Sequence, residues 1–258
     1  MTHPYFEKTR HPRVLAHRGL ITAAGEASGV WENTAAAFAA AQAAGVEFIE
    51  TDCRVTADGD VVLFHDETLQ RLTGDPRPIH TIRTRELSRV FEAHGGILTV
   101  AEALDLFPST RFNIDVKTLA AAAPLGPVLA EHTHRTLVTS FADRNRRATV
   151  AAVLRAGAGM RPATSAGLRT IAAVRAASTV RLSPARILRG IDALQIPERR
   201  GPLTVLTPAL LRAARSRGVE VHVWTVNDPS EMRRLVAVGV DGVVTDRADE
   251  ALSVLARE

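Results

Sequence analysis

The chain has few of the residues that mark secreted, membrane and nucleic-acid-binding proteins. Cysteine occurs once in 258 residues, at Cys53, so no intramolecular disulfide can form and nothing indicates an oxidising compartment. No apolar run approaches the ~18 residues that a membrane span needs, and Met1 to Arg10 contains no apolar segment typical of a secretory leader. We therefore expect a cytoplasmic protein without stable membrane insertion.

Aromatic residues and lysines are also scarce. Aromatic side chains make up 4% of the chain, and lysine occurs only at Lys8 and Lys117. The 32 basic residues are mostly scattered arginines, and 28 acidic residues leave a formal net charge of only +4. Nucleic-acid-binding proteins typically gather basic residues into a patch with aromatic stacking surface. We therefore expect no nucleic-acid partner, and the sequence indicates no oligomeric state.

Short β-branched runs alternate with Ala- and Leu-rich stretches of helical length along the chain. This alternation is typical of a parallel sheet covered by helices. Eight candidate strands predict a (β/α)₈ TIM barrel, which usually needs about 250 residues, as one domain over residues 1–258. The expected strands are Val14–Ala16, Glu47–Arg54, Arg111–Val116, Thr136–Ser140, Arg161–Thr164, Ala193–Ile196, Glu220–Thr225 and Gly242–Thr245.

Helical patterns lie between these strands, and several end at a glycine that suits a left-handed cap. The expected helices are Thr34–Ala44, Thr99–Leu106, Arg144–Ala156, Leu168–Ala177, Pro208–Arg217 and Glu231–Val238.

One segment interrupts the alternation after the second strand. The turn signal Asp58-Gly59 precedes the apolar run Val61–Phe64, which predicts that this strand folds back as a hairpin. Residues Glu67–Ile97 then form an insertion before the third strand.

Polar residues gather where the expected strands end, which is where a barrel of this kind carries its working residues. Glu50 and Asp52 are two apart on one strand and share a face, as do Asp115 and Lys117 on the next. Carboxylates that point together into a barrel repel one another unless a cation holds them, and oxygen ligands suit Mg²⁺ or Ca²⁺. We expect Glu50, Asp52 and Asp115 to converge on one divalent ion.

An ordered set of motifs covers the chain from about residue 14 to 247 and resembles the glycerophosphodiester phosphodiesterase family. The motifs are Ala16-His17-Arg18-Gly19, Glu32-Asn33-Thr34, Phe48-Ile49-Glu50-Thr51-Asp52, Asp58-Gly59, Phe64-His65-Asp66, Leu72-Thr73-Gly74, Asn113-Ile114-Asp115-Val116-Lys117, Val223-Trp224-Thr225-Val226-Asn227 and the segment Gly239 to Asp246.

The resemblance implies a divalent-metal-dependent hydrolase that converts small glycerophosphodiesters to glycerol 3-phosphate and an alcohol. It also implies the following roles: His17 and His65 as the acid/base pair, Arg18 and Lys117 at the phosphate, Trp224 against the glycerol or leaving group, Glu50 and Asp52 as metal ligands, and Glu32 as an active-site acid near the metal. This chemistry is physically sound, because cations stabilise the charge of a phosphodiester transition state and two imidazoles can transfer both protons.

One departure from the family pattern concerns Asp115, which stands where glutamate is usual and is shorter by about one carbon–carbon bond, ~1.5 Å. Either the ion lies closer to this strand or a water molecule bridges the gap. Three alternatives remain open: a lysophospholipase D, favoured by a wide apolar groove, a catalytically silent barrel that binds a phosphorylated ligand, and a metal-dependent sugar isomerase or aldolase, since the fold alone does not assign a reaction.

Overall fold

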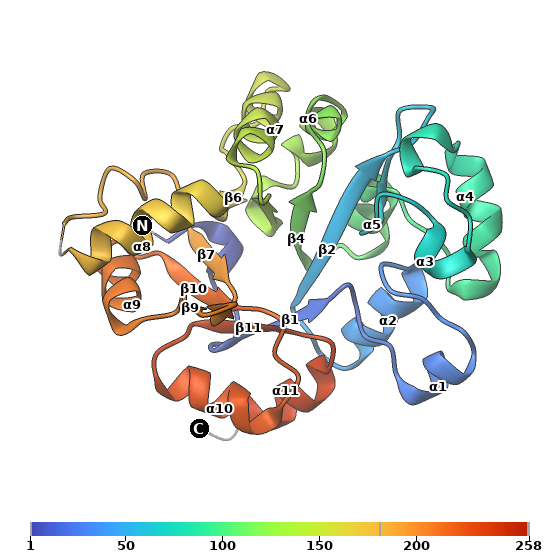
Figure 1. Ribbon diagram of the computed structural model, residues 1–258. Coiled ribbons are helices and arrows are strands. Elements are labelled where there is room, and N and C mark those ends of the chain that lie inside the picture. The colour runs from blue at the N-terminus through green and yellow to red at the C-terminus, as the bar shows by residue number, and fades with distance from the viewer. Residues whose placement is uncertain (1, 181, 257–258) are drawn as a thin grey trace.

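The computed structural model describes residues 2–180 and 182–256 and confirms the predicted barrel (Figure 1). Its parallel strands are β1 (Arg13–His17), β2 (Phe48–Val55), β4 (Arg111–Val116), β5 (Thr136–Thr139), β6 (Ala163–Thr164), β7 (Ala193–Ile196), β10 (Glu220–Val223) and β11 (Gly242–Thr245). They pair in the order β6-β5-β4-β2-β1-β11-β10-β7. A parallel bridge from Ser165, directly after β6, to Ala193 of β7 joins the two ends.

Helices surround the barrel, as Figure 1 shows. The helices that cover the strands are α2 (Ala35–Ala43), α5 (Val100–Leu106), α6 (Ala122–Ala130), α7 (Asp143–Arg155), α8 (Leu168–Thr179), α9 (Pro208–Arg215), α10 (Pro229–Ala237) and α11 (Ala248–Leu255). Helices α6 and α11 were not among the expected helical patterns. None of the helices in the described part of the chain is long and apolar enough to cross a bilayer.

Side-chain caps explain where several helices begin. Thr34 accepts a hydrogen bond from the backbone of Ala37 at the start of α2, and Thr207 does the same for α9. Thr99 and Glu102 form a capping box at the start of α5. Such caps satisfy backbone N–H groups that the first turn leaves free, so helix starts are readable from the sequence to within a residue or two.

The predicted hairpin is present: β3 (Val61–Leu63) pairs antiparallel with β2. Gly59 has φ 92°, a conformation that favours glycine. The insertion that follows contains α3 (Gln70–Thr73) and α4 (Thr84–Phe91) and has an apolar cluster of its own, in which Phe64 and Phe91 are in edge-to-face contact. The loop after β1 carries one more short helix, α1 (Ala23–Ala27). Short 3₁₀ segments lie at Pro4–Phe6, Ile79–Thr81, Glu92–His94, Leu119–Ala121 and Thr133–Arg135.

Three strands are shorter than the sequence predicted. β5 ends at Thr139, one residue before the expected Ser140, and two other strands differ by two residues each. The fifth barrel strand begins at Ala163 rather than Arg161, because Pro162 has no N–H to donate to a ladder and the Arg161 guanidinium is bound to Asp192. The seventh, β10, ends at Val223 rather than Thr225, which leaves Trp224 in the loop at the barrel mouth.

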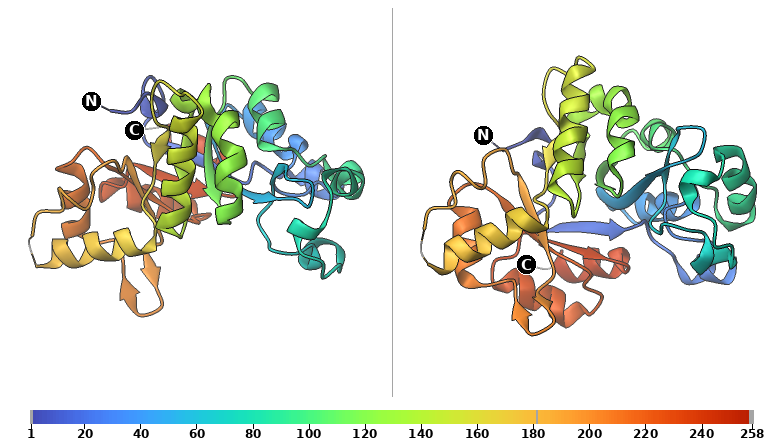
Figure 2. Two further views of the ribbon diagram at one scale, coloured as in Figure 1. Left: turned by 90° about the horizontal axis from the view of Figure 1, so that it is seen from above. Right: turned by 45° about the horizontal axis from the view of Figure 1, so that its top comes forward.

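A small hairpin after β7 was not expected from the sequence. Its strands β8 (Arg199–Arg200) and β9 (Leu203–Thr204) pair antiparallel. In the left view of Figure 2, this hairpin (orange) projects from the end of the barrel opposite the N-terminus. The other end is filled by the N-terminal segment, where Tyr5 is buried against Phe48 inside the barrel. The open end of the barrel is therefore the end where the strands finish.

Candidate active site

Strand register brings the predicted polar residues together at the open end. In the ladder between β1 and β2, His17 pairs with Glu50, and between β2 and β4, Asp52 pairs with Asp115. Residues two apart on a strand face the same side, so Lys117, directly after β4, follows Asp115 into the mouth. Cys53 points the other way, into the apolar layer between sheet and helices, as the alternation predicted.

The loop after β1 is held in an unusual backbone conformation. Arg18 and Gly19 both have positive φ, 59° and 93°. A Cβ on Gly19 would lie 2.8 Å from the Cβ of Ala37, so only glycine fits this contact. The Arg18 N–H donates to the Glu50 carbonyl at 2.7 Å. These constraints turn the Arg18 side chain back across the end of β2.

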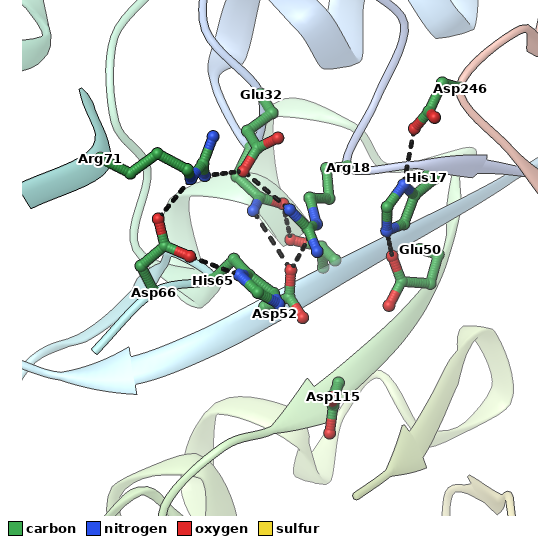
Figure 3. Close-up of polar contacts among 12 residues, drawn as sticks. His17, Arg18, Glu32, Glu50, Asp52, His65, Asp66, Arg71, Asp115 and Asp246 are labelled. Atoms are coloured by element: carbon green, nitrogen blue, oxygen red, sulfur yellow. Dashed lines mark hydrogen bonds and ion pairs between the residues drawn. The ribbon is translucent and has the colours of Figure 1, made fainter. Parts of the chain in front are cut away.

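Asp52 lies between two cationic groups, Arg18, which Figure 3 shows beside it, and Lys117. The Arg18 Nε is 3.0 Å from Asp52 Oδ2, and the Lys117 Nζ is 2.7 Å from Asp52 Oδ1. Burial alone would raise the pKa of this carboxyl group, but the charges of Lys117 and Arg18 lower it. The same Lys117 ammonium donates to Asp115 Oδ2, also at 2.7 Å, so one cation joins two acids of neighbouring strands.

Glu50 is the acid at the mouth whose negative charge is least balanced by neighbouring cations. Burial raises its pKa well above the ordinary value, and the nearby charges of Asp52 and Asp115 add to the effect. Burial also raises the pKa of Asp115, against the influence of Lys117. Glu50 Oε2 and Asp115 Oδ1 are buried and accept no hydrogen bond from the described residues. Within those residues, no three acidic, histidine or cysteine side chains are close enough together to hold a metal ion.

Each of the two histidines has a carboxylate partner on the same ring nitrogen. His17 Nδ1 lies 2.6 Å from Asp246 Oδ1, and His65 Nδ1 lies 2.6 Å from Asp66 Oδ1. A carboxylate can only accept, so Nδ1 carries the hydrogen in both rings. The opposite nitrogen of each ring, Nε2, is then available for other contacts; in His17 it lies 4.0 Å from Glu50 Oε2.

Glu32 contacts guanidinium groups. Its Oε1 accepts from Arg18 at 2.8 Å and also from Arg71 on α3, while Arg71 Nε donates to Asp66 Oδ2 at 2.6 Å. The contacts drawn in Figure 3 thus run from His65 through Asp66, Arg71 and Glu32 to Arg18. The insertion thereby connects one histidine with the arginine of the loop after β1.

A single pocket of about 540 Å³ opens over these residues. Every site residue expected from the sequence lines it except Glu32, which lies outside it behind Arg18. Trp224 borders the pocket, half-buried, in edge-to-face contact with Phe141 at 5.8 Å. Asp66, Arg71 and Asp246 were not among the site residues expected from the sequence. Asp66 follows His65 and Asp246 follows the last strand, positions that could have indicated them; Arg71 carries no such signal.

Two carboxylate-fixed histidines near a guanidinium and an ammonium offer the proton transfer and the positive charge that a phosphoric diester hydrolase needs, and the comparisons with known proteins place the chain in that class. A family model described as the glycerophosphoryl diester phosphodiesterase family matches residues 17–250. A Mycobacterium tuberculosis protein named "Probable glycerophosphodiester phosphodiesterase 2" is 34% identical over 98% of this chain and 94% of its own length. The chain belongs to the glycerophosphodiester phosphodiesterase family.

Further matches include a relative named for a second activity and two solved structures with the same fold. A human lysophospholipase D is 26% identical over 90% of this chain and 82% of its own. The crystal structure of a Thermotoga maritima glycerophosphodiester phosphodiesterase, 25% identical, superimposes with a TM-score of 0.70 over 95% of this chain and 99% of that one. An Oleispira antarctica phosphodiesterase solved with its product sn-glycerol-3-phosphate, 21% identical, has a TM-score of 0.68 over 95% and 97%.

Proposed function

We propose that this chain, acting as one barrel domain, hydrolyses small glycerophosphodiesters by acid/base catalysis with His17 and His65. The observation that carries the proposal is that both rings are fixed at Nδ1 by carboxylates and line one pocket with Arg18 and Lys117. A ring fixed in this way presents Nε2 for proton transfer, as acid/base catalysis requires. Family membership favours hydrolysis over the silent barrel and over the isomerase or aldolase.

Arg18 and Lys117 supply positive charge where the phosphate would bind. Both are already paired with Asp52, so their side chains are held in place before substrate arrives, and a preorganised cation stabilises transition-state charge without reorganising. We propose that Glu32, through its contact with Arg18, acts as a positioning residue rather than as a direct metal ligand. Trp224 offers an aromatic face to the glycerol or the leaving group.

The acids at the mouth fit a divalent cation. Their donors are all oxygens, the ligands that Mg²⁺ and Ca²⁺ prefer, and two buried oxygens, on Glu50 and Asp115, have no hydrogen bond from the described residues. We propose Glu50, Asp52 and Asp115 as the residues that would hold the ion. The described residues contain no assembled three-ligand cluster, so holding it requires these carboxylates to draw closer together than they are with Lys117 between Asp52 and Asp115. When bound, such an ion neutralises charge on the phosphate and on the attacking oxygen.

Two routes are compatible with these residues. One histidine can take the proton from the substrate's own glycerol hydroxyl, which gives a cyclic phosphate that water then opens, or it can take the proton directly from water. In either case the second histidine protonates the departing alkoxide. Quenching turnover at early times and assaying for the cyclic ester separates the routes, because only the first route forms that ester.

The test of the two-histidine proposal uses His17→Ala and His65→Ala with glycerophosphocholine and with a nitrophenyl phosphodiester. Loss of a placed proton-transfer group typically costs about 10²–10⁴-fold in turnover. A good leaving group needs little protonation, so the nitrophenyl ester should rescue the variant that lacks the acid and not the one that lacks the base. His80→Ala, which removes an exposed histidine outside the pocket, is the control. Parental turnover in both variants would reject the mechanism.

A second candidate function, a lysophospholipase D, is favoured by the apolar side of the pocket. Leu168, Ile171 and Ala172 recur on one face of α8 and line the pocket together with Leu203 and Val205. Such a wall suits the acyl chain of a lysophospholipid. Ala172→Asp should then lower kcat/KM for lysophosphatidylcholine more than for glycerophosphocholine, whereas equal losses would favour the small glycerophosphodiesters alone.

A further inference from the structure

The pocket has an outer border that the hydrolysis of a small diester does not require. Three large apolar side chains line the pocket and yet are well exposed to solvent: Phe141 at 51%, Leu168 at 38% and Leu203 at 55%. A single exposed apolar side chain is ordinary, but a group of them around one binding pocket marks a contact surface. Three different segments contribute them: the loop after β5, helix α8 and the β8–β9 hairpin. Phe141 joins this border to the inner site, since its ring contacts Trp224 and the ring centroid lies 5.7 Å from Lys117 Nζ.

Three arginines line the same outer part. Arg175 lies on the pocket-lining face of α8, seven residues or about 10 Å beyond Leu168, and Arg199 and Arg200 lie on β8. None of the three is within ion-pair distance of a carboxylate that the structure describes; Arg175 and Arg199 donate to neutral oxygens of Thr204. The neighbouring acid Glu198 is paired with Arg234. The outer part therefore carries uncompensated positive charge.

We propose that this outer rim is a docking face for a lipid bilayer that carries negative charge. The outer rim consists of Phe141, Leu168, Leu203, Arg175, Arg199 and Arg200. Apolar side chains that enter the interface, together with arginines at the level of the phosphates, are the combination that binds a protein to an anionic bilayer.

The place of the rim in the fold supports this partner over others. The β8–β9 hairpin, which carries half of the rim, stands out from the open end of the barrel (Figure 2), so it can reach a flat surface. The rim is continuous with the apolar wall of α8, which leads inward to the phosphate-binding cations. A lipid drawn from the bilayer would enter headgroup first, with its chain trailing along that wall. A soluble polyanion would contact the arginines but would make no contact with the apolar side chains of the rim.

Vesicle binding tests the docking face directly and needs no turnover. Full-length protein is sedimented with vesicles of phosphatidylcholine and with vesicles of an equimolar mixture of phosphatidylcholine and phosphatidylglycerol, and only the second should bind it. Each arginine near an anionic surface gives roughly a five-fold gain in affinity, so R199Q/R200Q should weaken binding by about 30-fold. Leu203→Asp should weaken binding too, which a purely ionic contact would not predict.

Matched controls lie at the opposite end of the barrel. Arg215 and Arg217 are exposed arginines at the end of α9 and in the loop after it, also without a carboxylate partner among the described residues, and Leu106 is a 59% exposed leucine at the end of α5. R215Q/R217Q and Leu106→Asp should bind like the parent. Circular dichroism and thermal melts establish that every variant is folded.

Three results would overturn the docking face: equal binding to neutral and anionic vesicles, equal losses in rim and control variants, or affinity for soluble heparin that depends on the arginines but not on Leu203. A chain that hydrolyses glycerophosphodiesters but ignores anionic vesicles would reject the docking face alone and leave the proposed hydrolysis intact.

Discussion

The carboxylates behind the two histidines provide a quantitative test of the site. Asp246 and Asp66 each accept from Nδ1 of a histidine at 2.6 Å, so replacing either by alanine frees the ring to rotate or to change tautomer. We expect kcat to fall in both variants with little change in KM, because the acids orient the rings and do not line the phosphate site. The two losses should differ in size.

The expected difference follows from how exposed each carboxylate is and from which side chains hold it in place. A hydrogen bond to a charged group contributes about 1.5–3 kcal/mol when shielded, and solvent reduces that value. The Asp246 side chain is 52% exposed and is held by Asn227, so we expect the low end, a loss of about ten-fold in kcat. Asp66 is 21% exposed and bound by Arg71, so its loss should reach about 30-fold or more.

The assay is steady-state hydrolysis of glycerophosphocholine with ¹⁵N NMR of the histidine rings, which reports the tautomer directly. Asp246→Asn keeps an acceptor and should recover part of the loss. Asp249→Ala, an exposed acid on the first turn of α11, serves as the control. The reasoning is refuted if both variants keep parental kcat, if Asp249→Ala is equally impaired, or if the ring tautomers do not change.

Three further outcomes follow from the charged groups of the barrel. Exhaustive chelation should abolish turnover and Mg²⁺ or Ca²⁺ should restore it; Asp115→Glu should retain substantial activity while Asp115→Ala loses metal affinity and turnover together, as activity titrated against metal would report. At the amino end of the barrel, burial would raise the pKa of Glu220, but His222 and Arg13 lower it from 4.5 to about 2, so its contribution to stability is present above pH 4.5 and is lost as the pH falls toward 2. Glu220→Gln should therefore cost about 1–3 kcal/mol at neutral pH and little near pH 2 in urea unfolding, whereas a pH-independent cost would contradict the assignment.

Short-range sequence patterns predicted most of the fold and the site residues that lie on strands. The alternation of apolar runs predicted the barrel, the Asp58-Gly59 turn predicted the hairpin, and the two-residue period placed Glu50 and Asp52 on one face. These features depend on residues close together in the chain. The short β6 could also have been anticipated, because Pro162 has no N–H for the ladder.

Contacts between distant segments could not be read in this way. The Lys117 ammonium between Asp52 and Asp115 depends on the register between β2 and β4, and the sequence indicates only that these side chains share a mouth. The contacts of Arg71 with Glu32 and Asp66 depend on how the insertion folds back over the loop after β1. Neither set of contacts leaves a pattern in neighbouring residues of the sequence, so only the three-dimensional structure shows them.

The two sides of the pocket come from different halves of the chain, and this division has a physical consequence. The carboxylates and their cations come from β1, β2 and β4, where each buried charge depends on a neighbour, so a single replacement disturbs several groups. The apolar wall comes from α8 and the hairpin after β7, whose side chains depend on no ionic partner. Substitutions in this second half can change which substrate groups fit beside the phosphate without disturbing the charged side chains that bind the phosphate. Substrate choice among such barrels should therefore depend on the segment from Leu168 to Val205 more than on the acids and histidines.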